Sequence, residues 1–159
     1  MSQVLQAKVV TVSDGVFHGV REDRSGEALY EQLLAAGWQV VERRVVADGV
    51  ESVADVLREL SKGFAGLIVT TGGTGFGPRD LTPEGTQSVL ERTAPGMAEA
   101  ARLVNPQLGR LSRGLAGTLG QSLILNTPGS PKGCVECLGA VLDMIPHALS
   151  LMTGETTLH

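Results

Sequence analysis

The sequence predicts an α/β fold in which a mainly parallel sheet lies between two layers of helices. Runs rich in Val, Ile and Leu alternate along the chain with stretches whose apolar residues recur at helical spacing. Two of these runs, 66–71 and 122–125, are short and largely apolar, as is typical of central parallel strands. Because strands joined through helices make right-handed crossovers, helices are expected on both faces of the sheet.

The first half of the chain divides into two strand–helix pairs. Strong Val content marks the strands, while Asp48-Gly49 and Gly63 are the breaks that follow the second strand and the second helix. The predicted elements are, in order, a strand at 7–12, a polar loop, a helix from its cap Ser25 to Ala36, a strand at 38–46 and a helix at 50–62.

The second half repeats the alternation with proline at two helix starts. Thr82-Pro83 and Ser130-Pro131 both read as a capping residue followed by a first-turn proline. The predicted elements are a strand at 66–71, helical stretches from Thr82 to about Leu111, a strand at 122–125, a helix from Pro131 that Pro146 breaks, and a last helix to about Met152.

Size and composition indicate one globular domain covering residues 1–159. A length of 159 residues suits a single core, and a hydrophobic content of 42% with 19% charged residues argues against disorder. Met1–Lys8 lacks the pattern of a signal peptide, and no apolar run approaches the ~18–20 residues of a membrane helix. We therefore expect a cytoplasmic protein without a membrane partner.

The charge balance disfavours nucleic acid as a partner. The formal net charge is −4, and Arg43–Arg44 is the only adjacent basic pair. Nucleic-acid binders usually carry a basic face. A small anionic ligand stays possible, since a few local Arg and Lys residues bind phosphate whatever the net charge.

The Cys134-x-x-Cys137 pair has three interpretations. A redox pair needs a thiol at the very start of a helix, and a zinc site needs two further ligands. The favoured interpretation is two small apolar residues on one helix face.

Polar and glycine-rich segments follow the predicted parallel strands, so they should converge on one edge of the sheet, where ligands bind in such folds. These segments are 13–15, 48–49, 72–75 and 126–130. The turn formed by Gly72, Gly73, Thr74 and Gly75 offers unobstructed backbone N–H groups for a phosphate or carboxylate. It matches neither the P-loop nor the dinucleotide-binding pattern, because Pro78 and Arg79 follow.

Three aspartates on these loops are candidate metal or substrate ligands. Asp80 and Asp48 could hold Mg²⁺ against a triphosphate, with Asp14 as a further candidate. The alternative, which the spacing alone favours, is that these aspartates are ordinary turn residues, or in the case of Asp80 an additional helix cap. Ser112 and Arg113 form a candidate phosphate contact or a surface pair, and Pro128, Gly129 and Ser130 a second anion site or a rigid turn.

Several motifs taken together resemble the molybdopterin adenylyltransferase family, which is similar to the G domain of gephyrin. The similarity runs from about residue 7 to residue 152, and the 71–84 block is its most specific part. The motifs are Thr-Val-Ser-Asp at 11–14, Asp-Arg-Ser-Gly at 23–26, Thr-Gly-Gly-Thr-Gly-Phe-Gly-Pro-Arg-Asp-Leu-Thr-Pro-Glu at 71–84, Ala-Pro-Gly-Met at 94–97, Leu-Ser-Arg at 111–113 and Asn-Thr-Pro-Gly-Ser-Pro-Lys-Gly at 126–133.

The resemblance implies a three-layer molybdopterin-binding domain that forms a homotrimer. It implies transfer of AMP from ATP to molybdopterin with Mg²⁺, and transient contact with a molybdate-inserting protein. Asp48 and Asp80 match the family's functional carboxylates. Its substrate loops match Gly72 to Gly75, Ser112, Arg113 and Pro128 to Ser130.

Two residues depart from the family pattern. Thr127 stands where an apolar residue is usual, and Gly85 stands where Ala is usual, which is expected to cost about 1 kcal/mol of helix stability. The alternative function is a protein that binds or carries molybdopterin without catalysis. A scaffolding role is disfavoured because no linker or second domain is evident in the sequence.

Overall fold

The computed structural model describes residues 4–154. Its strands are β1 (Gln6–Val12), β2 (Gln39–Val46), β3 (Gly66–Thr71), β4 (Arg92–Thr93), β5 (Ala116–Leu119) and β6 (Ser122–Thr127). Its helices are α1 (Asp14–Phe17), α2 (Arg24–Ala35), α3 (Val50–Ser61), α4 (Thr82–Gln87), α5 (Pro95–Leu103), α6 (Pro106–Gly109), α7 (Pro131–Gly139) and α8 (Ile145–Met152). The predictions for Met1–Lys8 and for the C-terminus fall partly on residues 1–3 and 155–159, outside the described part.

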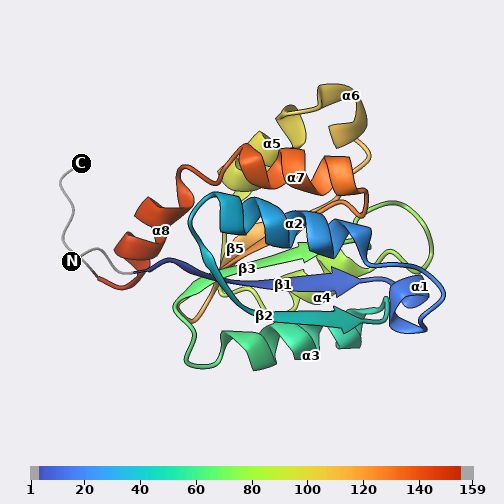
Figure 1. The fold of residues 1–159 in the computed structure, drawn as a ribbon, viewed down its shortest axis with the longest axis horizontal. Helices are drawn as coiled ribbons and strands as arrows, with labels where there is room; N and C mark the ends of the chain where they lie inside the picture. The colour runs from blue at the N-terminus through green and yellow to red at the C-terminus, as the bar shows by residue number, and fades with distance from the viewer. Residues whose placement is uncertain (1–3, 155–159) are drawn as a thin grey trace.

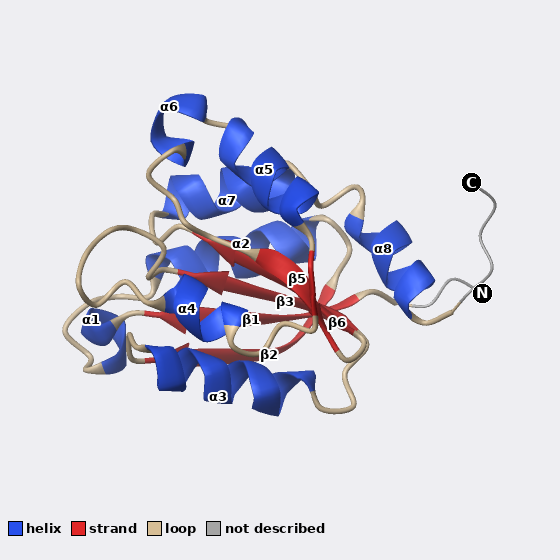
Figure 2. Cartoon of the chain, turned by 180° about the vertical axis from the view of Figure 1, so that it is seen from behind, coloured by secondary structure: helices blue, strands red, loops and turns tan. Residues whose placement is uncertain are grey.

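A six-stranded mixed sheet forms the centre of the molecule, in the order β2-β1-β3-β6-β5-β4. The first four strands in this order are parallel, while β5 and β4 are antiparallel to their neighbours. Helices α2, α5 and α7 lie on one side and α3 and α4 on the other (Figures 1 and 2). The predicted α/β class and mainly parallel sheet are confirmed.

Alternation along the strands divides the core between the two faces of the sheet. Ala7 and Val9 of β1 pack with α2, α7 and α8, whereas Val10 and Val12 pack with α3. All six residues of β3 are buried, which agrees with its central place in the sheet. Within residues 4–154, no helix is long and apolar enough to cross a membrane.

Two antiparallel strands and one short helix were not predicted from the sequence. The stretch 82–111 is not continuously helical, because β4 separates α4 from α5. The polar loop after β1 contains α1, which Ser13 caps by accepting a hydrogen bond from the Val16 N–H. These elements have two to four residues, too few for a hydrophobic period to emerge.

Three predicted helix boundaries were wrong. Asp23, not Ser25, caps α2, and its carboxylate accepts a hydrogen bond from the Gly26 N–H at 3.0 Å. Thr82 is the first residue of α4 and does not cap it. Pro146 lies in the first turn of α8 and does not end the preceding helix, since α7 already stops at Gly139.

The two departures from the family pattern have local explanations. A methyl group on Gly85 would lie 2.7 Å from the Val50 carbonyl oxygen and 2.8 Å from Cβ of Val53, so glycine allows α4 to pack closely on α3. Thr127 is fully buried, and its hydroxyl donates to the Thr70 carbonyl at 2.7 Å.

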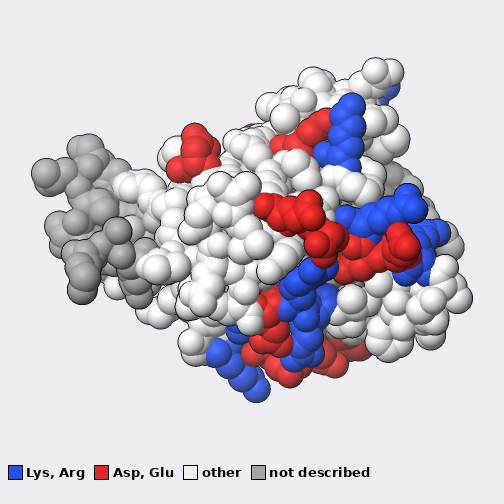
Figure 3. All heavy atoms as spheres, in the orientation of Figure 1, with Lys and Arg blue, Asp and Glu red and all other residues white. Residues whose placement is uncertain are grey.

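The visible charges of the face in Figure 3 are mixed in sign, and the surface over α8 is largely uncharged. Ion pairs connect β2 to the flanking helices: Arg43 pairs with Glu27 of α2, and Arg44 with Glu59 of α3. Each of these two cations is therefore paired with an acidic side chain.

Candidate active site at the carboxyl edge of the sheet

Strands β1, β2, β3 and β6 end at one edge of the sheet, and the loops that follow them enclose two cavities. The larger cavity, about 680 Å³, is lined by the ends of β1 and β3 and by the loop before α2. The smaller one, about 350 Å³, is lined by the loops after β3 and β6, by residues on either side of α6, and by parts of α5, α6 and α7. Gly73, Asp80 and Gly129 line both cavities, so the two meet there. The predicted convergence of loops on one edge is confirmed.

The turn after β3 needs glycine at two positions. Gly72 and Gly73 have φ of 103° and 69°, and a methyl group on either would lie 2.2 Å from Val12 O or Thr82 Oγ1. Thr82 fixes the turn, because its hydroxyl donates to Gly72 O at 2.9 Å and its N–H donates to Gly73 O at 3.0 Å. Thr74 is buried beside them, and Gly75 lines the smaller cavity.

Asp14 and Asp48 are held together by reciprocal hydrogen bonds. The Asp14 N–H donates to the Asp48 carboxylate at 2.9 Å, and the Asp48 N–H donates to the Asp14 carboxylate at 3.1 Å. Burial raises the pKa of Asp48, and the negative charges of Asp14 and Asp80 raise it further. Asp48 therefore carries a charge that a nearby cation would stabilise.

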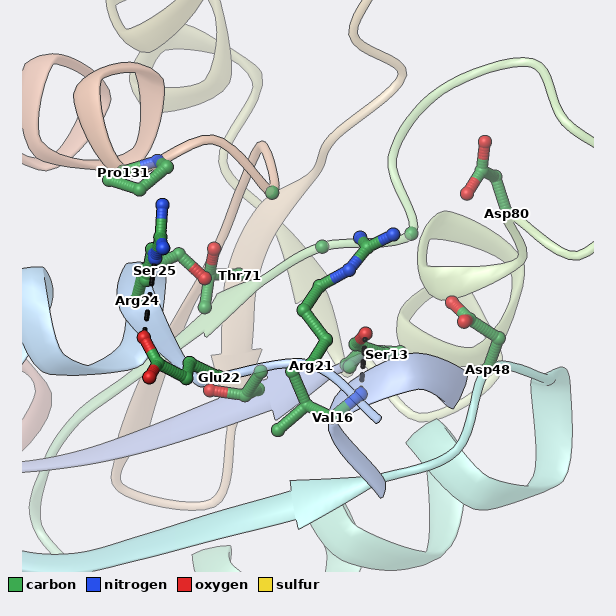
Figure 4. A pocket seen from close by; sticks show the side chains of 15 residues that line it. Ser13, Val16, Arg21, Glu22, Arg24, Ser25, Asp48, Thr71, Asp80 and Pro131 are labelled. Carbon is green, nitrogen blue, oxygen red and sulfur yellow. Dashed lines mark hydrogen bonds and ion pairs between the residues drawn. The ribbon is translucent and has the colours of Figure 1, made fainter. Parts of the chain in front are cut away.

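Asp80 lies on the same side of the larger cavity as Asp48 (Figure 4). Its carboxylate accepts a hydrogen bond from the Gly77 N–H at 2.9 Å, and α4 has no side-chain cap. The alternative that Asp80 merely caps this helix is thus not what the structure shows.

Arg79 neutralises Asp14 and was not predicted as a site residue. Its guanidinium donates to both Asp14 carboxylate oxygens, at 2.9 and 3.0 Å, and to the Asp48 carbonyl at 2.9 Å. These hydrogen bonds lower the pKa of Asp14. Asp14 is therefore paired, which leaves Asp48 and Asp80 as the carboxylates open to a metal. Arg79 directly precedes Asp80 in the sequence, and this position could have identified it as a site residue.

Arg113 stabilises the loop that carries Asp80 through hydrogen bonds. It donates to the Gly75 carbonyl at 2.9 Å, to the Asp80 carbonyl at 2.7 Å and to the Glu84 carboxylate at 2.6 Å. All three of its guanidinium nitrogens are thus engaged within the protein. Direct contact between Arg113 and a substrate stays a prediction.

Ser112 and the loop after β6 complete the smaller cavity, which Pro128, Gly129 and Ser130 all line. Ser130 caps α7 by accepting a hydrogen bond from the Gly133 N–H at 3.0 Å, as predicted. The Pro128 carbonyl accepts a hydrogen bond from Thr71 at 2.7 Å, which fixes this loop against the end of β3.

Asp48 and Asp80, which both line the larger cavity, could hold a divalent cation whose remaining ligands would come from a substrate. No cluster of three or more His, Cys, Asp or Glu suited to a metal exists within residues 4–154. Mg²⁺ is typically held by one or two protein carboxylates together with phosphate oxygens and water. The carboxylate pair therefore suits a metal that arrives with a phosphorylated ligand.

The two cysteines do not form an activated thiol pair. Burial raises the pKa of both Cys134 and Cys137 to about 11, so neither is a thiolate near neutral pH. Both thiols contact backbone carbonyls, of Ser25 and Pro131 for Cys134 and of Ala101 for Cys137.

Comparison with known proteins gives a consistent result. Residues 8–147 match the family model described as a probable molybdopterin binding domain. The molybdopterin adenylyltransferase of Helicobacter pylori is 37% identical over 159 residues, which cover 96% of this chain and 90% of that protein. The molybdenum cofactor synthesis protein cinnamon of Drosophila melanogaster is 38% identical over 94% of this chain, but that alignment covers 26% of cinnamon. The molybdopterin biosynthesis enzyme MoaB of Thermus thermophilus has a TM-score of 0.88 at 45% identity, covering 96% of this chain and 98% of that chain.

Proposed function

The chain belongs to the molybdopterin-binding domain family of molybdenum cofactor biosynthesis, and we propose that it transfers AMP from ATP to the phosphate of molybdopterin. The observation that carries the proposal is the meeting of two cavities at Gly73, Asp80 and Gly129. Transfer of a group between two phosphorylated molecules needs two binding sites that adjoin, so that the reacting phosphates of the two substrates can meet. Similarity to a protein named molybdopterin adenylyltransferase supports the same reaction.

The two substrates are assigned by the character of each cavity. The smaller cavity has apolar walls from Val104, Leu108 and Leu111 and includes Ser112, which suits the pterin ring system. The larger cavity is more polar and holds both Asp48 and the open side of the Gly72-Gly73 turn, which suits ATP. The α-phosphate of ATP then lies beside Asp80, where the pterin phosphate reaches it.

The residues of this chain orient the charged phosphates of the two substrates, and none of them has to act as a general base. The pterin phosphate is already largely ionised near pH 7, since its second pKa is about 6. Asp48 and Asp80 would hold Mg²⁺, which supplies Lewis-acid stabilisation of the phosphate charge. The N–H groups of Gly73, Thr74 and Gly75 stabilise the negative charge that develops on the phosphate oxygens, whereas the Gly72 N–H already donates to the Thr127 carbonyl. The two cavities fix the line of attack.

Three further properties belong to the proposal. The protein is a homotrimer, it acts in the cytoplasm, and it passes adenylylated molybdopterin to a molybdate-inserting protein through a transient contact. These follow from the family resemblance and from the need to hand on a reactive product.

The experiment that tests the function combines the protein with ATP, MgCl₂ and molybdopterin. We expect one pyrophosphate released for each molybdopterin consumed, together with a product whose mass is raised by one AMP unit. A protein that only carries molybdopterin would bind the pterin without releasing pyrophosphate, and that result would overturn the enzymatic proposal.

A further inference from the structure

Arg21 is a cation that lines the larger cavity. It lies in the loop between α1 and α2, and Figure 4 shows its side chain extending into the cavity toward the side that carries Asp48 and Asp80. Its guanidinium makes no hydrogen bond or ion pair with any part of the chain that the structure describes, residues 4–154. The other arginine of this cavity, Arg24, is paired with Glu22.

The backbone holds Arg21 in this direction. Its N–H donates to the Gly15 carbonyl at 3.2 Å, and the N–H of Val20 donates to the same oxygen at 2.9 Å. A methyl group on Gly15 would lie 3.4 Å from Cβ and 3.5 Å from Nε of Arg21, so the arginine stem runs directly over Gly15. Arg21 is therefore anchored at its base and free at its guanidinium.

We propose that Arg21 binds the β- and γ-phosphates of ATP and so selects a nucleoside triphosphate over the monophosphate. The inference rests on the proposed function, which places ATP in this cavity with its α-phosphate beside Asp80. The terminal phosphates then lie further inside the same cavity, where a guanidinium can form two parallel hydrogen bonds to phosphate oxygens.

This contact also favours departure of the leaving group. An oxygen of the pterin phosphate forms a bond to the α-phosphorus, while the bond from that phosphorus to the oxygen bridging to the β-phosphate breaks. The bridging oxygen leaves with the electron pair as part of pyrophosphate. Arg21 stabilises the negative charge that accumulates on that group, and no proton transfer to it is required.

The test measures the dissociation constants of ATP and of AMP by calorimetry, with MgCl₂ present and molybdopterin absent so that no turnover occurs. We expect Arg21→Ala to raise the Kd of ATP about 10- to 100-fold, the range that one charged hydrogen bond supplies, and to leave that of AMP within about twofold. Arg21→Lys should restore part of the ATP affinity, because it keeps the charge but not the planar fork.

Arg58→Ala is the matched control, since Arg58 is an exposed arginine on α3 whose guanidinium pairs with Asp55. It should leave both dissociation constants unchanged. Unchanged ATP binding in Arg21→Ala, or equal weakening of ATP and AMP, would overturn the assignment while leaving the proposed reaction intact. Failure of the unmodified protein to bind ATP would overturn the proposed reaction as well.

Discussion

Asp48, a proposed metal ligand, is held where its charged form is disfavoured. It is half-buried, Asp14 and Asp80 lie near it, and its pKa is raised by burial first and by their charges next. In the folded protein the ionised form is disfavoured, so above the raised pKa the charge of Asp48 costs stability. That cost disappears as the pH falls toward the pKa that an aspartate has in the unfolded chain.

Asp48→Asn should therefore stabilise the protein while removing a proposed metal ligand. The amide oxygen can still accept the hydrogen bond from the Asp14 N–H, and the repulsion is gone. After allowance for solvent screening we expect a gain of about 0.5 kcal/mol, or a Tm rise of roughly 1–2 °C at pH 7. The gain should vanish in acid, once Asp48 of the unmodified protein is protonated. A lower Tm for the variant at pH 7, measured by scanning calorimetry, would contradict this account.

Arg113→Ala should weaken molybdopterin binding more than ATP binding. Arg113 holds the Gly75 carbonyl, and Gly75 lines the smaller cavity, whereas Asp80 keeps a second anchor through the Gly77 N–H. We expect the Kd of molybdopterin to rise about 10-fold or more, because hydrogen bonds to a charged group are worth about 1.5–3 kcal/mol. Titration of both ligands checks this, with the exposed Arg110→Ala as the control. Equal molybdopterin affinity in the two variants would remove Arg113 from the site.

The sequence allowed the acidic residues to be predicted better than the basic ones. Asp14 and Asp48 directly follow parallel strands and Asp80 follows the glycine turn, so topology brings them together. Arg21 and Arg79 lie in irregular loops, and only the folded paths of those loops show that Arg21 is free while Arg79 is bound to Asp14. Loop geometry of this kind leaves no periodic signal in a sequence.

At the scale of elements, α4 packs against α3 and begins two residues after Asp80. Gly85 sits at this contact with no room for a methyl group. From propensity alone, replacing a glycine inside a helix by alanine is expected to stabilise the helix. Here packing opposes propensity, and the close backbone contact with Val50 decides the outcome.

We therefore expect Gly85→Ala to destabilise the protein by about 1–3 kcal/mol, the usual cost of overpacking. Gly96→Ala is the matched control, because Gly96 lies in α5 with nothing within 4 Å of an added methyl group. That variant should be neutral or slightly more stable. The free energies of unfolding of both variants are measured from urea unfolding curves. A more stable Gly85→Ala protein would contradict this expectation, because it would show that α3 and α4 can move apart to accommodate the methyl group at little cost.

The long elements were predictable from the sequence, and the short ones were not. Strands β1, β2, β3 and β6 were each located to within a few residues, because each is a run of β-branched and apolar residues between clear breaks. Strands β4 and β5 are set by antiparallel pairing with one another and with β6. Such pairing is a tertiary effect, so local pattern could not reveal it.

At the scale of the whole molecule, several large apolar side chains are left on the surface. Leu103, Val104, Leu108 and Leu111 are all exposed in the segment from α5 to just after α6. Exposed apolar side chains gathered in one segment are typical of contact surfaces. Three of them, Val104, Leu108 and Leu111, also line the smaller cavity, so the proposed pterin site accounts for their exposure.

The assembly prediction is a homotrimer, because closed symmetric assemblies are the common form of soluble oligomers and the family resemblance implies three copies. Light scattering coupled to size exclusion should give three times the mass of one chain at micromolar concentration. A monomer under those conditions would contradict the prediction.

The central claim is that Asp80, at the wall shared by the two cavities, anchors the metal for AMP transfer. The most direct measurement is pyrophosphate release by Asp80→Asn, with molybdopterin binding titrated on the same preparation and the exposed Asp143→Asn as the control. The amide can still accept the hydrogen bond from the Gly77 N–H but loses the negative charge. We predict a loss of turnover of more than about 100-fold, equivalent to ~3 kcal/mol, with molybdopterin affinity retained. Near-normal turnover by Asp80→Asn would contradict the claim.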